Sequence, residues 1–149
     1  MRVRWIIVGS AVAAVCVPAA LAWSGRPAPP VPKPATAAGP PPAWAETSTK
    51  SVWLAFSGYC WKTTCADYLP PASRPDLPTI RLAHGAGIRV HFGLRPSKLS
   101  ITLLGAKTTT RTVAPVQVIT WRPGESGVAT FSLKGSSGSA SYAARIRIR

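Results

Sequence analysis

The sequence is poor in acidic residues. Its 149 residues contain four Asp and Glu against 18 Lys and Arg, which gives a formal net charge of +14 at pH 7. A protein surface with this imbalance attracts polyanions such as anionic cell-wall polymers, acidic lipid headgroups, extracellular nucleic acid and acidic polysaccharide. A second interpretation is that the basic residues are only solvated and bind nothing.

Motifs of catalysis are also missing. The chain has no G-x-S-x-G elbow, no H-E-x-x-H helix and no phosphate-binding glycine loop. Among the few acidic residues, only Asp67 suggests a hydrolytic pair, with His84 or His91, and that pairing is speculative. The sequence therefore favours a protein that is not an enzyme and needs no cofactor, with a small hydrolase as the least favoured alternative.

Cysteine is scarce, with three residues, and Cys16 lies in an apolar amino-terminal segment. If the chain is exported, Cys60 and Cys65 are the pair that reaches an oxidising compartment, and we expect them to form a disulfide. Together with His84 and His91 they also make the ligand set of a zinc site. The histidines are too far apart for the usual H-x3-5-H spacing, so we predict no metal, and C-x4-C departs from the redox motif C-x-x-C.

The amino-terminal segment has the layout of a secretory signal peptide. Arg2 and Arg4 precede an uncharged apolar run, and small residues at 20 and 22 predict residues 1–22 as the signal peptide. Positively charged residues stay on the cytoplasmic side of the membrane. The residues after the apolar run are therefore expected to be extracytoplasmic, either secreted or associated with the cell envelope. Two alternatives remain: an uncleaved membrane anchor, since the run is close to the ~20 residues that span a bilayer, and a lipoprotein acylated at Cys16, which lacks a small residue immediately before it.

Residues 23–49 are predicted to be a disordered linker. Prolines stand at 27, 29, 30, 32, 34, 40, 41 and 42. Such a chain favours extended polyproline II, about 3.1 Å per residue, and can hold a domain away from its attachment point. A linker without a function of its own is the alternative.

Residues 50–149 are predicted to form one all-β domain, a small antiparallel β-sandwich of an immunoglobulin-like or similar type. Apolar and polar residues alternate, and Gly, Pro and Ser recur about every ten residues. A turn at 123–126 predicts a hairpin between strands at 116–121 and 127–133. The expected core residues are Ile88, Val90, Phe92, Leu99, Ile101, Leu103, Tyr142, Ile146 and Ile148.

The last predicted strand, 139–149, alternates most clearly. Arg145, Arg147 and Arg149 share one face at intervals of about 6.6 to 6.8 Å. Such a stripe suits a linear polyanion, but it equally suits an edge strand protected by charge against pairing with another chain.

The segment around the cysteines is the candidate ligand-binding loop. Tyr59, Trp61 and Asp67 surround the expected disulfide, and aromatic rings held on a rigid loop are good binding anchors. Arg89, on a strand at 88–92, joins them as a candidate contact together with the three carboxyl-terminal arginines. The alternative is that these rings pack against the disulfide as core.

Gly58-Tyr59-Cys60-Trp61, Cys65-Ala66-Asp67, the segment from Ile80 to Phe92 with Gly87, then Pro96 and a closing strand that begins at Gly138 resemble a group of secreted bacterial β-domain proteins, often lipoproteins, without an assigned activity. The resemblance covers most of residues 56–149. It implies an extracytoplasmic all-β domain with its two cysteines bonded and adds no catalytic residue. The chain departs from the group at Cys16 and in its strong positive charge.

Taken together, the sequence predicts a non-enzymatic binding module that is secreted or associated with the envelope. Its expected partner is an anionic envelope polymer, and an envelope protein is the alternative. Nucleic acid is not favoured, and membrane contact is expected only through the amino-terminal segment.

Overall fold

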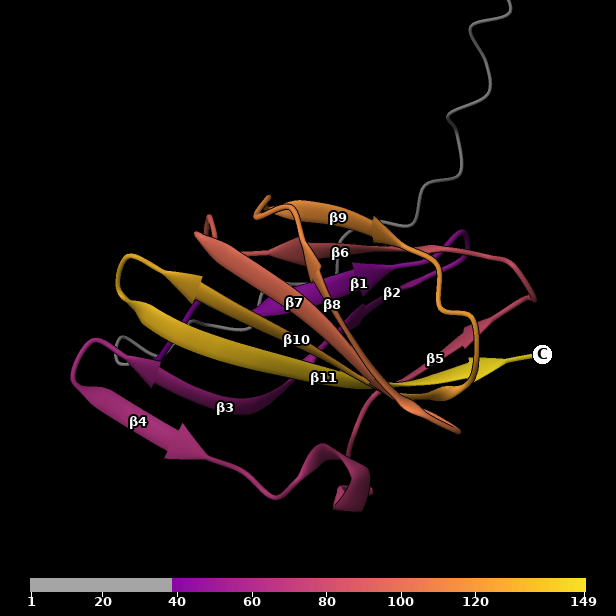
Figure 1. Ribbon diagram of the computed structural model, residues 1–149, viewed down its shortest axis with the longest axis horizontal. Helices are drawn as coiled ribbons and strands as arrows, with labels where there is room; N and C mark the ends of the chain where they lie inside the picture. The colour runs from indigo at the N-terminus through magenta and orange to yellow at the C-terminus, as the bar shows by residue number, and fades with distance from the viewer. Residues whose placement is uncertain (1–38) are drawn as a thin grey trace, which may run out of the picture.

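The fold is all-β, a sandwich of two sheets (Figure 1). The computed structural model describes residues 39–149. In these residues most strands carry apolar side chains on one face, and the two sheets bury those faces against each other. The strands are β1 Ala43–Glu46, β2 Ser51–Trp53, β3 Ala55–Trp61, β4 Thr64–Asp67, β5 Thr79–Leu82, β6 Ile88–Phe92, β7 Lys98–Leu104, β8 Thr108–Val113, β9 Val118–Trp121, β10 Gly127–Gly135 and β11 Gly138–Ile148.

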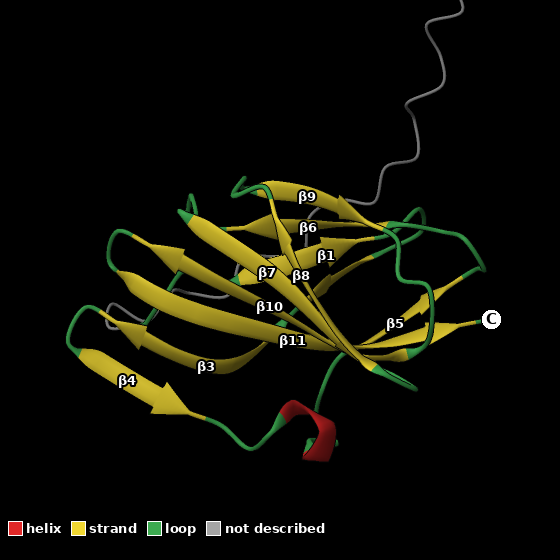
Figure 2. Cartoon of the chain, viewed as in Figure 1, coloured by secondary structure: helices red, strands yellow, loops and turns green. Residues whose placement is uncertain are grey.

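The small sheet has the strand order β2-β1-β6-β9, and the large sheet has β4-β3-β11-β10-β7-β8. The short strand β5 joins the large sheet by pairing with the end of β11 in parallel. The other pairs are antiparallel, as predicted. The helical content of the described residues is one 3-10 turn, Pro71–Ser73, between β4 and β5 (Figure 2).

Aromatic rings from both sheets meet in the core. Phe92 of the small sheet lies 6.3 Å from Phe131 and 6.2 Å from Tyr142 of the large one, measured between ring centroids. Trp121 packs edge-on against Phe131 at 5.6 Å. All the predicted core residues are buried except Ile148, which is half-buried and packs at the margin of the core.

The predicted hairpin across 123–126 is wrong. β9 pairs with β6 in the small sheet, whereas β10 pairs with β7 and β11 in the large one. The turn-forming run therefore carries the chain from one sheet to the other. A second crossing lies at Leu54, between β2 of the small sheet and β3 of the large one.

The folded domain begins earlier than residue 50. Ala43–Glu46, expected in the linker, form β1, which lies between β2 and β6 and buries Ala43 and Ala45 completely. The Tyr142 hydroxyl donates a hydrogen bond to the Pro41 carbonyl oxygen, which ties the chain before β1 to the large sheet. The predicted signal peptide and residues 23–38 of the predicted linker lie outside the described residues.

The idea that the last strand guards a sheet edge is also wrong. β11 lies inside the large sheet, with β10 on one side and β3 and then β5 on the other. Its even-numbered residues 140–146 are buried and its odd-numbered residues face outward. The arginines are therefore displayed on the outer face of a sheet interior, where protection against strand pairing is not needed.

Candidate functional site

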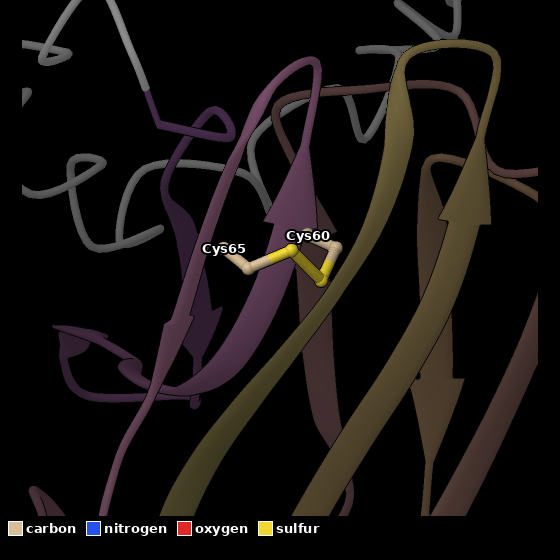
Figure 3. The surroundings of a disulfide bond; sticks show 2 residues. All are labelled: Cys60 and Cys65. Atoms are coloured by element: carbon tan, nitrogen blue, oxygen red, sulfur yellow. A yellow bond between two sulfur atoms is a disulfide. The ribbon is translucent and has the colours of Figure 1, made fainter.

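The Cys60–Cys65 disulfide links the two strands of a hairpin (Figure 3). The residues are directly opposite each other in the β3–β4 register, so their side chains share one face and meet. Both cysteines are exposed on the outer face of the large sheet. The expected disulfide is thus present, and it stiffens an outer hairpin rather than the core.

The aromatic residues of this hairpin point the other way. Trp61 is 8% exposed, and Tyr59 is half-buried against the core with its ring 5.5 Å from that of Phe56. Alternation explains this, because Cys60 faces out and its two neighbours therefore face in. Trp61 is therefore a core residue, as the alternative interpretation of these rings has it, while Asp67 is exposed on β4.

The four candidate arginines do not form one stripe. Arg145 is half-buried and donates a hydrogen bond of 3.1 Å to the Arg74 carbonyl oxygen, so it supports the fold. Arg89 lies on β6 in the small sheet, opposite Glu46. Arg147 and Arg149 remain exposed at the end of β11.

A basic cluster does exist where β5 pairs with β11. The register sets Arg81 beside Arg147 on the same outer face, and both side chains are exposed. Arg149 and Lys50 join them, because Lys50, Arg81 and Arg149 line a depression of about 470 Å³. We call Lys50, Arg81, Arg147 and Arg149 the arginine cluster.

The cluster holds like charges at close range. Neighbouring strands lie about 4.8 Å apart, so the Arg81 and Arg147 side chains leave adjacent backbone positions on one face, and their like charges repel unless an anion lies between them. Ion pairs between described residues join Arg74 to Asp76 and His91 to Glu46, and neither includes a member of the cluster. This arrangement is suited to binding phosphate or carboxylate groups, which the planar guanidinium holds with paired hydrogen bonds.

The segment 70–78 covers part of the outer face of the large sheet. The covered part lies next to the arginine cluster, since Ala143 precedes Arg147 along β11. Leu77 packs there with Val128 and Ala143 in a small apolar group. Arg74 fixes the segment, since its guanidinium donates to the Phe56 carbonyl oxygen and to both carboxylate oxygens of Asp76. The hydrogen bond from Arg74 lowers the pKa of the Asp76 carboxyl group and raises that of Arg74.

His91 belongs to a different group, on the outer face of the small sheet. Its ring stacks on Trp44 with centroids 3.7 Å apart, and its Nε2 atom lies 3.0 Å from Oε2 of Glu46. Asp67 is on the outer face of the large sheet, so His91 and Asp67 are not brought together. The cysteines of the considered zinc set are bonded to each other, and residues 39–149 contain no group of three potential metal ligands.

The sequence matches no known family model, and no curated protein or solved structure is significantly similar to it. The site is therefore interpreted from its own chemistry. Within the described range, no helix is long and apolar enough to cross a membrane.

Sequence reasoning missed Arg81 and Lys50 as members of the site. Arg81 was visible as the polar residue between two core residues, Ile80 and Leu82, but a parallel pairing with β11 has no local signal. Lys50 lies in the connection of the β1–β2 hairpin, at the first residue of the predicted domain, where no strand or site was expected. The alternation of β11 identified Arg147 and Arg149 correctly as exposed residues.

Proposed function

We propose that this domain is a non-enzymatic, extracytoplasmic binding module for an anionic polymer of the cell envelope, and that the arginine cluster is its main contact. The observation that carries the proposal is the position of Arg81 beside Arg147, with no acidic partner for either among the described residues. Electrostatic repulsion makes that arrangement costly in the free protein, and a bound polyanion removes the cost.

The overall charge supports the same function. The formal net charge of +14 is spread over a short chain, so its field draws a polyanion toward the surface from beyond direct contact. Each contact at an exposed site is weak, and repeated contacts along a polymer add up through high effective concentration. The exposed disulfide is compatible with an extracytoplasmic location.

The test is binding to fractionated envelope polymers across a salt series. We would use the full chain, purified in mild detergent so that an apolar amino-terminal segment stays in solution, and compare it with an Arg81→Glu/Arg147→Glu variant. The reversal should weaken binding by about tenfold or more at low salt, equal to at least about 1.4 kcal/mol. Binding of the unaltered protein should weaken steadily as salt screens the charges.

Two control variants separate the cluster from bulk charge. Lys62→Glu/Arg122→Glu makes the same change in net charge at two exposed residues outside the cluster and should bind nearly as well as the unaltered protein. Arg81→Lys/Arg147→Lys keeps the charge but loses the planar guanidinium groups. Its affinity should lie between those of the two charge-reversal variants. Equal loss in both charge-reversal variants would mean that net charge alone drives binding, and salt-independent binding would favour an envelope protein as the partner.

A further inference from the structure

A second basic surface lies at the opposite end of the large sheet. Lys98 of β7 is directly opposite Lys134 of β10 in the strand register, and both side chains are exposed. Like charges in such a pair destabilise a sheet. Neither lysine is in an ion pair with an acid of residues 39–149.

The two lysines line a depression of about 570 Å³ on the outer face of the sheet, together with Ser100, Ser132 and Ser139. A neighbouring depression of about 450 Å³ shares Ser139 and Ser141 with it and reaches Asp67. We call the two together the lysine groove. The face is hollow here because the outward-facing residues nearest to the lysines, Ser100 on β7 and Ser132 on β10, are small.

Hydroxyl groups form the floor of the groove in register. Ser100, Ser132 and Ser141 occupy matching positions on β7, β10 and β11. Ser132 and Ser141 are hydrogen-bonded to each other at 2.9 Å between oxygen atoms, which orients both hydroxyls. A hydroxyl both donates and accepts hydrogen bonds, so this floor matches a ligand that is itself rich in hydroxyl groups.

We propose that the lysine groove binds an acidic glycan, with Lys98 and Lys134 on a carboxylate or phosphate group and the serine hydroxyls on the sugar hydroxyls. Charge complementarity selects the acidic group. Val113 and Pro115 at one rim give apolar contact for the CH faces of sugar rings. The larger depression has no aromatic residue in its lining, and the ring of Tyr59, which borders the smaller one, packs toward the core against Phe56, so the groove lacks the stacking platform on which single-stranded nucleic acid depends.

The groove is separate from the arginine cluster. Ser139 and Arg147 stand eight residues apart on β11, about 26 Å along the strand. In Figure 1 the β3–β4 hairpin and the β5–β11 pair lie at opposite ends of the molecule. The inference therefore goes beyond the proposed function, because a second site of different chemistry recognises the sugar units as well as the charge.

The test is calorimetric titration of the full chain with a defined acidic trisaccharide, trigalacturonic acid, and with its uncharged methyl ester. We expect the acid to bind and the ester to bind at least about tenfold more weakly. Ser132→Val/Ser141→Val should weaken binding of the acid by about tenfold or more. Valine fits a strand, so this variant should fold, which circular dichroism would check.

Matched variants complete the design. Thr108→Val/Thr120→Val removes two exposed hydroxyl groups at residues that do not line the groove, and this variant should bind the acid normally. Lys98→Gln/Lys134→Gln should reduce binding of the acid to the level of the ester. Arg81→Glu/Arg147→Glu should leave trisaccharide binding unchanged, so that failure of the polymer-binding proposal is distinguishable from failure of this one.

Three results would overturn the inference. They are no binding of the acid by the unaltered protein at low salt, equal affinity for acid and ester, and a serine variant that binds as well as its threonine control.

Discussion

The two ends of β11 present different chemistry on one continuous strand. At the amino-terminal end, Ser139 and Ser141 face outward beside β3, which is stiffened by the disulfide hairpin. At the carboxyl-terminal end, Arg147 faces outward beside the short strand β5. The inward residues of β11 are apolar at both ends, so both ends pack against the core in the same way.

The difference teaches that packing and recognition are encoded in alternate residues of the same strand. Every second side chain fixes β11 in the core, and the intervening ones are free to specify a ligand. Segment 70–78 separates the two outer surfaces by covering Ala143 between them. Changes to the shared core should therefore affect both ends, and changes to outward residues should affect one.

Removing a shared core ring should have the largest effect. Phe131 is fully buried on β10 of the large sheet and contacts the rings of Phe92 and Trp121, which both belong to the small sheet. We expect Phe131→Ala to lower the free energy of unfolding by about 3 to 5 kcal/mol, through lost burial and the cavity that remains. Urea denaturation measures it, and both binding surfaces should be lost together at the new midpoint. A loss below about 1 kcal/mol would show that this ring does not join the two sheets.

Opening the disulfide should affect one end more than the other. Cys60→Ser/Cys65→Ser removes a short ring, which is worth about 2 kcal/mol of unfolding free energy in the chain-entropy model. Amide hydrogen exchange should accelerate more in β4 than in β5 and the end of β11. Equal acceleration at both ends would mean that the hairpin is not an independent unit.

Much of this architecture follows from the sequence, because alternation alone identifies β5, β6, β7, β10 and β11 and their buried faces. Alternation does not say which strands pair. The segment 123–126 looks like a hairpin turn but crosses between sheets, and the β3–β4 turn at Lys62 has a positive φ of 54° without the Asn-Gly or Asp-Gly pair that signals such turns. The strand β8 escaped notice because its threonines are exposed on both faces at the sheet edge.

The candidate site was harder to predict for the same reason. Arg147 and Lys98 are each visible in the sequence as exposed cations, but their partners Arg81 and Lys134 become neighbours only through pairing between distant strands. The sequence left two positions open for the Trp61 ring, exposed at a binding loop or packed in the core, because the facing of the hairpin was unknown. Its neighbour Cys60 settles the facing, since a disulfide on the outer face turns the tryptophan inward.

A smaller change tests how the chain before β1 is held. Tyr142→Phe removes the hydrogen bond to the Pro41 carbonyl oxygen and keeps the ring in the core. We expect a loss of about 1 kcal/mol of unfolding free energy, measured by urea denaturation. Burial raises the pKa of Tyr142 above its ordinary value in the folded protein. The stabilisation that depends on the neutral phenol is therefore fully present below about pH 10, and it is lost as the pH rises further toward the folded pKa. The phenylalanine variant should lose this part of the alkaline sensitivity, and an unchanged alkaline profile would contradict the assignment.

The smallest expected effect concerns the segment that separates the two ends of β11. The Arg74 guanidinium lowers the pKa of the Asp76 carboxyl group in the folded protein. The stabilisation is therefore present above the ordinary pKa of about 3.8 and is lost as pH falls through the lower folded value. Solvent screens the pair because the Asp76 side chain is 61% exposed. Asp76→Asn should flatten the acid limb of the stability profile slightly and leave the neutral region nearly unchanged. If instead it speeds amide exchange at Ala143 at neutral pH, the ion pair itself holds the segment in place, and the two surfaces of β11 are kept apart by charge rather than by the packing of Leu77.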